Sequence, residues 1–102
     1  MEQQQSANED DYSIYVWKKE VMDYIRALLT QSKKHDFILI KARGDAISKA
    51  LEVSKVAVEH FLHGWHIKNT ITDKEMRPDR FGDGEKEVST IRIELVKEDV
   101  TR

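Results

Sequence analysis

The chain has 102 residues, no cysteine, and 17 lysines and arginines against 19 acidic residues, which gives a formal net charge of −2. This length fits one small domain with a modest core, which oligomerisation would help to stabilise. The absence of cysteine excludes a disulfide framework or a thiolate metal site. No stretch is apolar enough for a signal peptide or a membrane span, so we expect a soluble protein of the cytoplasm.

The N-terminal segment differs in composition from the rest of the chain. Residues 1–12 contain no base and four acids, Glu2, Glu9, Asp10 and Asp11. Removing their charge of −4 leaves 17 bases against 15 acids, a net charge of +2, in residues 13–102. A polar, acidic segment buries too little apolar surface to offset the entropy of ordering. We therefore expect a disordered acidic tail over residues 1–12, which would compete weakly with phosphate, and a folded domain over residues 13–102.

The first predicted unit is a strand followed by a helix. Apolar and polar residues alternate over residues 12–17, which is the period of a strand. Lys18 and Lys19 follow directly. From Val21 onward the apolar residues recur at spacings of three and four, which predicts a helix of about 14 residues ending near Lys34. Cations at that end would suit the negative pole of the helix dipole.

The second unit begins with a short apolar run that becomes basic. Four successive large apolar residues, 37–40, predict a buried strand, with Lys41 and Arg43 where it ends. Gly44 permits a turn that is closed to other residues, and Asp45 is expected to cap the next helix or to complement its positive N-terminus. A strand that enters a helix through a basic turn is a geometry suited to phosphate.

The remaining elements are a second helix and a hairpin. Apolar residues at helical spacing run from Ile47 to about Leu62, and alternation predicts half-exposed antiparallel strands over 65–71 and from residue 88. The charged segment 72–87 between them has turn signals and is expected to project into solvent as a long hairpin. The order strand, helix, strand, helix, strand, strand predicts an α+β two-layer sandwich, a four-stranded mixed sheet with both helices on one face.

This order would bring two pairs of basic residues together. If the first two strands are parallel, their carboxyl ends lie at one edge of the sheet, so Lys18 and Lys19 would converge with Lys41 and Arg43 into a phosphate-binding patch. Without further support, such residues are more commonly solvated loop residues. The pattern alone leaves both interpretations open.

Four stretches resemble the Alba family, small archaeal chromatin proteins with eukaryotic relatives in RNA metabolism. They agree in order and spacing: VWKKEVMDY (16–24), LIKARGDAISKA (39–50), VSKVAVEHFL (53–62) and VSTIRIEL (88–95). The resemblance covers roughly residues 13–97. It implies the α+β fold just predicted, similar to the C-terminal domain of bacterial translation initiation factor three, and a homodimer or a heterodimer.

The resemblance also implies roles for individual residues. In the family, the lysine pair and the arginine of the ARG turn contact the nucleic-acid backbone, which here are Lys18, Lys19 and Arg43. Lys18 matches the reported acetylation target, which implies a deacetylase as a partner. Phe61 matches a position that packs between neighbouring dimers on DNA, and a core phenylalanine is the alternative.

The hairpin supplies a second candidate region. Arg77, Arg80 and Lys86 match in position the family's flexible arms, which reach along the minor groove, where arginine reads shape and negative potential. Six acids interleave with these bases and bring the arm close to neutral: Asp73, Glu75, Asp79, Asp83, Glu85 and Glu87. A merely solvated hairpin remains the alternative.

Three residues depart from the family pattern. Trp17 and Glu20 stand where typical members have glycine and proline around the lysine pair, and Asp45 stands where many have a second arginine. An aspartate in place of an arginine changes the charge by two units at a phosphate site, which predicts weaker binding. This departure is that of a divergent paralogue that binds more weakly, and pairing with a more basic member of the family is the alternative role for such a chain.

Other functional classes find little support. His60, His63 and His66 are spaced by three, but no carboxylate or cysteine pattern completes a metal site. A single glycine makes no nucleotide-binding loop, and no serine, histidine and acid set has a catalytic context. We expect neither an enzyme nor a bound cofactor or metal.

Together these observations predict a dimeric Alba-like protein of the cytoplasm and the chromosome. It would bind double-stranded DNA through backbone contacts, without marked sequence specificity, and compact the chromosome. RNA is the alternative ligand. A heterodimerisation subunit that modulates a more basic paralogue is the alternative role.

Overall fold

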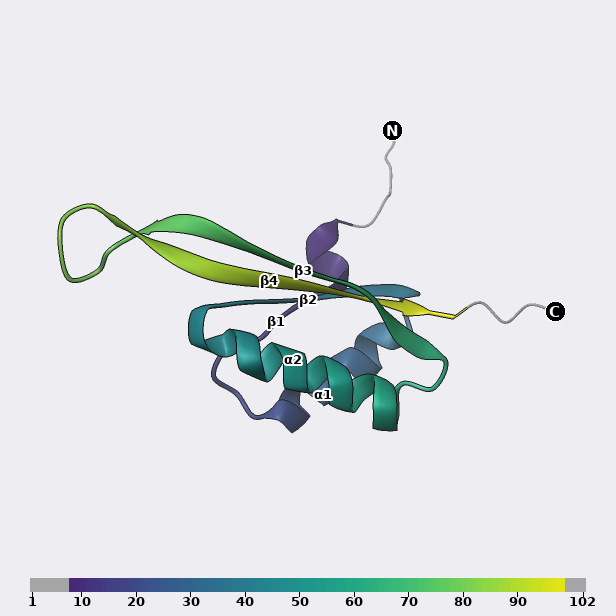
Figure 1. Ribbon diagram of the computed structural model, residues 1–102. Coiled ribbons are helices and arrows are strands. Elements are labelled where there is room, and N and C mark those ends of the chain that lie inside the picture. The colour runs from purple at the N-terminus through teal and green to yellow at the C-terminus, as the bar shows by residue number, and fades with distance from the viewer. Residues whose placement is uncertain (1–7, 99–102) are drawn as a thin grey trace, which may run out of the picture.

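The computed structural model describes residues 8–98 as a two-layer α+β domain (Figure 1). A four-stranded sheet has the order β1-β2-β4-β3; β1 and β2 are parallel, and β4 is antiparallel to both its neighbours. Helices α1 and α2 cover one face of the sheet. The elements are β1 (Ser13–Tyr15), α1 (Val21–Ser32), β2 (Phe37–Arg43), α2 (Ile47–Val56), β3 (Trp65–Pro78) and β4 (Glu85–Lys97). The predicted fold class and element order are confirmed.

The core lies between the helices and the sheet. Alternation along β4 places Ile91, Ile93 and Leu95 in this core, while Arg92 and Glu94 point to the other face, which we call the open face. The helices contribute the apolar stripes that the sequence predicts, with Ile25, Leu28 and Val53 fully buried. No helix in residues 8–98 is long and apolar enough to cross a membrane.

The first two strands differ from the prediction in length. The first ends at Tyr15, although the Val16 N–H still donates to the carbonyl of Lys41 at 2.8 Å. The second continues to Arg43, because Lys41 and Arg43 pair with residues of β4. Lys41 therefore lies inside β2 and not at its end, so the prediction for its position was wrong, whereas Arg43 is the last residue of the strand, as predicted.

The turn after β2 contains a glycine in a conformation that other residues rarely adopt. Gly44 has φ +59° and opens a 3₁₀ turn, η2 (Gly44–Ala46), which leads into α2. The predicted capping hydrogen bond from Asp45 is absent, because the N-cap position of α2 is Ala46, and neither η2 nor α2 has a side-chain cap at its start. Asp45 keeps only the second predicted role, an acid in the first turn of η2.

After α2 the helix widens into a π-helical turn, η3 (Ala57–Phe61), before the chain enters the hairpin. The hairpin is regular for most of its length: β3 and β4 pair from Trp65 opposite Lys97 to Pro78 opposite Glu85, with one irregularity near Ile67. Figure 1 shows this ribbon extending well past the helices. The predicted projecting hairpin is confirmed, although much of the segment 72–87 is strand.

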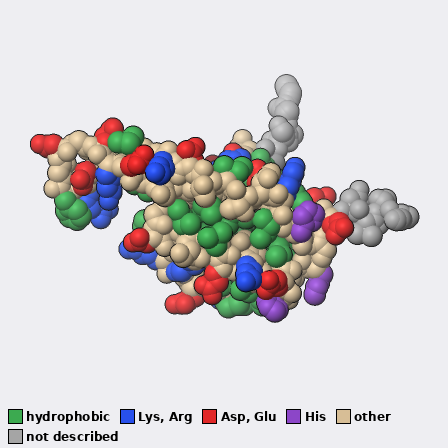
Figure 2. Space-filling view, viewed as in Figure 1, with side chains coloured by type: hydrophobic (Ala, Val, Ile, Leu, Met, Phe, Trp, Pro, Cys, Tyr) green, Lys and Arg blue, Asp and Glu red, His purple; other side chains and the backbone are tan. Residues whose placement is uncertain are grey.

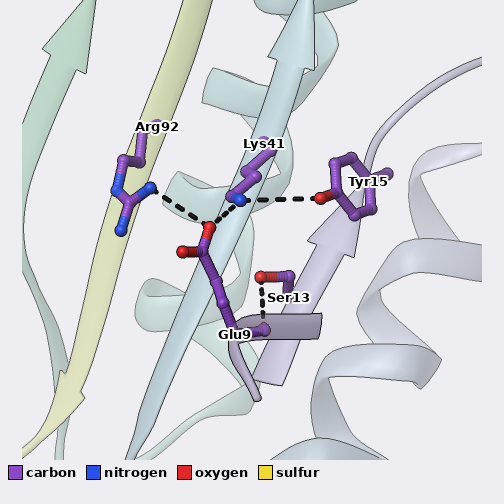
Figure 3. Close-up of polar contacts among 5 residues, drawn as sticks. All are labelled: Glu9, Ser13, Tyr15, Lys41 and Arg92. Atoms are coloured by element: carbon purple, nitrogen blue, oxygen red, sulfur yellow. Dashed lines mark hydrogen bonds and ion pairs between the residues drawn. The ribbon is translucent and has the colours of Figure 1, made fainter. Parts of the chain in front are cut away.

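The segment before β1 packs against the open face. Residues Glu9–Tyr12 form a 3₁₀ helix, η1, on the side of the sheet opposite α1 and α2 (Figure 1). The Tyr12 ring meets the Phe37 ring edge-on with centroids 5.5 Å apart, and Glu9 reaches Lys41 and Arg92 (Figure 3). Residues 8–12 are thus ordered, which corrects the predicted tail over that part, because sequence composition does not reveal these contacts. Residues 1–7 and 99–102 lie outside the described residues.

Candidate nucleic-acid interface

The loop between β1 and α1, residues 17–20, has a fixed backbone. The hydroxyl oxygen of the buried Tyr24 accepts hydrogen bonds from the N–H groups of Trp17, at 2.7 Å, and Lys19, at 3.1 Å. The Lys49 ammonium, on α2, donates to the carbonyl oxygens of Lys19, at 2.6 Å, and Trp17, at 3.4 Å. These contacts hold in place the loop that carries Lys18 and Lys19. We call residues 17–20 the lysine loop.

The end of the lysine loop also starts α1. The Glu20 N–H donates to Asp23 Oδ2 at 3.0 Å. This hydrogen bond, together with the Arg26 guanidinium, holds the pKa of Asp23 below its usual value of 3.8. Glu20 is thus tolerated at the helix start, because its backbone makes the capping contact.

An open groove of about 860 Å³ lies between the lysine loop, the β2–α2 turn and the hairpin. Among residues 8–98, its walls carry six cations and a single acid, Asp45. The cations are Lys18, Arg43, Lys49, Arg77, Arg80 and Lys86. In Figure 2 basic side chains are visible both on the projecting arm and on the end of the body beneath it. We call this feature the basic groove.

Strand pairing explains why the hairpin contributes bases to the basic groove. Arg77 and Lys86 are register partners, so their side chains lie side by side on one face of the ribbon. Glu85 and Glu87 flank Lys86 and therefore alternate to the opposite face. Asp73 and Glu75 precede Arg77 at spacings of two, so they share its face, and the basic character of that face is confined to its outer part at Arg77 and Lys86.

Arg43 links the β2–α2 turn to the hairpin. Its Nη1 lies 3.1 Å from Glu75 Oε2, and Arg77 Nη1 lies 3.4 Å from the same oxygen. All three side chains are partly exposed, so these pairs contribute little to stability. Glu75 positions Arg43 and partly neutralises it, a contact that the sequence analysis missed because it joins residues 32 positions apart.

The four cations predicted to converge do so only in part. Lys18 and Arg43 line the basic groove, whereas Lys19 lies outside its lining. Lys41 lies on the open face in a neighbouring hollow of about 560 Å³, which shares Trp17 and Arg43 with the basic groove. Conversely, Lys49 lines the basic groove and was not predicted, because nothing in its helical spacing distinguishes it from a solvated lysine.

The remaining candidates have simpler surroundings. Phe61 is partly buried and packs against the core cluster, which is compatible with the core role. Within residues 8–98, no group of three histidines or acids could hold a metal ion. His60 lies 3.9 Å from Glu59.

The two-layer fold and the basic groove define a small α+β protein with a surface suited to phosphate. Residues 13–75 match the sequence model of the family described as Alba. The DNA/RNA-binding protein Alba of Methanoculleus marisnigri is 36% identical over 86 residues, which are 83% of this chain and 92% of that protein. The protein of the same name from Methanothrix thermoacetophila is 38% identical over 91 residues, or 87% and 98% of the two chains.

A solved structure gives the same result. Alba from Thermoplasma volcanium superposes with a TM-score of 0.76 at 34% sequence identity, covering 82% of this chain and 98% of that one. The chain therefore belongs to the Alba family, and the resemblance stated from its motifs is confirmed.

Proposed function

We propose that this chain binds double-stranded DNA through the phosphate backbone, with little sequence preference, and that it acts as a binding protein and not as an enzyme. The observation that carries this proposal is the basic groove, which within residues 8–98 is lined by six cations and one acid, although the whole chain has a net charge of −2. Glu75, outside the lining, pairs with two of these cations, Arg43 and Arg77, and leaves the other four without this partner. Cations distributed along a groove neutralise phosphates without reading bases. The relatives named DNA/RNA-binding proteins support nucleic-acid binding, the coarser part of this proposal.

The basic groove also suggests how the parts cooperate. The body supplies Lys18 and Arg43, and the hairpin supplies Arg77, Arg80 and Lys86, so a duplex could be held from two sides. A dimer would present two such grooves and could bring two DNA segments together, which is a route to compaction of the chromosome. In this role the protein would be found in the cytoplasm, on the chromosome.

Lys18 is the residue at which modification would act. Its ammonium lies 5.7 Å from the centroid of the Trp17 ring, at the edge of the basic groove. Acetylation would remove both its charge and this cation–π contact and would weaken DNA binding, and a deacetylase would restore it.

The test is a salt titration of duplex binding. Changing Lys18 and Lys19 to Glu should weaken binding to unrelated duplex sequences alike and flatten the dependence of log affinity on log salt, because fewer counterions are released. Fluorescence anisotropy at three salt concentrations measures both quantities. Lys33 and Lys34 changed to Glu form the matched control, since both are exposed at the end of α1, away from the basic groove. Equal slopes in the parent and the Lys18/Lys19 variant would refute the proposal.

A further inference from the structure

The open face carries a row of three side chains that crosses three strands. Tyr15 on β1 is the register partner of Lys41 on β2, and Lys41 is the partner of Arg92 on β4. Partners in register point to the same side of a sheet, and here that side is opposite α1 and α2. Figure 3 shows the three side chains together above the strands.

An anionic group already occupies the centre of this row. One carboxylate oxygen of Glu9, Oε2, lies 3.2 Å from Arg92 Nη1 and also pairs with the Lys41 ammonium, which the Tyr15 hydroxyl approaches at 3.5 Å (Figure 3). An oxygen anion between a guanidinium and an ammonium is the arrangement in which proteins hold phosphate. Burial, and then the Arg92 charge, lowers the pKa of Lys41 below its usual 10.5, so this cation is incompletely solvated and gains from an anionic partner.

The segment that supplies this carboxylate is short. η1 has four residues, and its polar links to β1 include the hydrogen bond from the Ser13 hydroxyl to the Glu9 carbonyl, at 2.7 Å. The Glu9 and Arg92 side chains are 38% and 41% exposed, and ion pairs at such sites add little net stability. A phosphate of a polyanion could therefore replace the Glu9 carboxylate.

Two aromatic side chains are exposed next to these cations. Tyr15 and Trp17 are 59% and 57% exposed. Tyr15 is the last residue of β1 and Trp17 lies two residues further on, and both line the hollow of about 560 Å³ that also contains Lys41. Large aromatic rings are normally covered, and rings beside cations on a sheet are the means by which proteins stack unpaired bases. A duplex keeps its base faces stacked inside, so these rings fit a single strand and not a double helix.

The acids near this hollow are engaged elsewhere. Glu75, which also lines it, pairs with Arg43 and Arg77. Glu94, the next open-face residue on β4, accepts a hydrogen bond from the Asn69 amide at 3.0 Å. Without Glu9, the row Tyr15, Lys41 and Arg92 would carry two positive charges.

We infer that the open face is a second binding site, for single-stranded nucleic acid. Tyr15 and Trp17 stack on bases, Lys41 and Arg92 hold a backbone phosphate, and Glu9 acts as a built-in competitor for that phosphate position. The site is separate from the proposed duplex function, although the two hollows share Trp17 and Arg43, so a strand could pass from one to the other.

The experiment compares labelled RNA and DNA single strands of about 12 nucleotides with a duplex, using the full chain and fluorescence anisotropy. Tyr15→Ala should weaken binding of the single strand by about tenfold, the loss expected for one stacked base, and leave duplex affinity unchanged. Tyr15→Phe keeps the ring and should restore binding. Glu9→Gln should strengthen single-strand binding severalfold, and Arg92→Gln should weaken it.

The outcomes separate this site from the basic groove. Lys18/Lys19→Glu tests the duplex function in the same assay, so failure of one proposal leaves the other standing. Preference for RNA or for DNA identifies the strand, and either supports the site. The inference is overturned if the parent and Glu9→Gln both fail to bind single strands, or if Tyr15→Ala and Arg92→Gln leave single-strand affinity unchanged. It is also overturned if those two changes lower duplex affinity equally. Melting curves of each variant confirm that the fold is retained.

Discussion

At the scale of single residues, Asp45 is distinguished because, in the part of the chain that the structure describes, it is the one acid that lines the basic groove. Its position in the first turn of η2 gives it a favourable interaction with that short helix, but no capping hydrogen bond. The contribution of Asp45 to stability is therefore smaller than a capping residue would give, while its charge still opposes phosphate. The effect of Asp45 on stability is therefore small, and its effect on phosphate binding is the one that remains.

Replacing Asp45 with Arg should consequently tighten duplex binding and raise the salt slope by about one phosphate contact. The free energy of unfolding should change by less than about 0.5 kcal/mol, since no hydrogen bond is lost from an exposed side chain. Anisotropy titrations and urea unfolding measure the two effects. Glu52→Arg on α2, exposed and outside the basic groove, is the control with the same charge change. A variant that binds no better than this control would show that the turn does not face phosphate.

At the scale of elements, the lysine loop shows how core residues position surface ones. Tyr24 and Lys49 belong to the two helices, yet both bind the loop's backbone, so packing of the helices determines where Lys18 points. Hydrophobic spacing identifies Tyr24 as a helix residue but not as a hydrogen-bond acceptor. A contact between a loop and a helix side chain depends on tertiary geometry, which a one-dimensional pattern does not contain.

Tyr24→Phe tests this arrangement, because it removes the hydroxyl and keeps the buried ring. Two N–H groups lose their acceptor, so we expect a loss of about 1–3 kcal/mol in the free energy of unfolding. Duplex affinity should fall as well, since the lysine loop becomes less ordered. Tyr15→Phe removes an exposed hydroxyl and is the control for unfolding and duplex binding. If both variants unfold alike in urea, the Tyr24 hydrogen bonds are not what holds the loop.

The difference between a one-dimensional pattern and tertiary geometry explains which parts of the fold were predictable. The periods of two and about 3.6 in the apolar pattern predict the order of strands and helices, because burial against one core imposes them. The fold class and the projecting hairpin followed from that pattern. The register of β2 against β4, which places Lys41 on the open face beside Arg92, depends on pairing between distant residues. The same holds for the Arg43–Glu75 pair, so the site was predicted less completely than the fold.

At the scale of the whole molecule, basic and acidic side chains gather on different surfaces. The basic groove lies at the end of the body beneath the hairpin, while η1, with its three acids Glu9, Asp10 and Asp11, packs over the open face. Leu39 on β2 belongs to the open face and lies outside the main core cluster, yet it is fully buried. Its register partner on β1 is Ser13, and η1 contacts both of these strands. Residues 9–12 are therefore both a cover for apolar surface and a source of negative charge.

Deleting residues 1–12 should separate these two roles when it is compared with a charge variant. The deletion removes η1 and its Tyr12–Phe37 contact, so we expect a loss of about 1–3 kcal/mol in the free energy of unfolding, the scale of exposing one buried leucine. The variant Glu9→Gln, Asp10→Asn, Asp11→Asn keeps Tyr12 and should lose much less. Both should bind single strands more tightly at low salt, because both remove the carboxylate between Lys41 and Arg92. Urea unfolding and anisotropy on the parent, the deletion and the charge variant test both roles. Equal stability of the deletion and the parent would mean that η1 does not cover the sheet. An unchanged single-strand affinity in both variants would mean that Glu9 does not block the phosphate position.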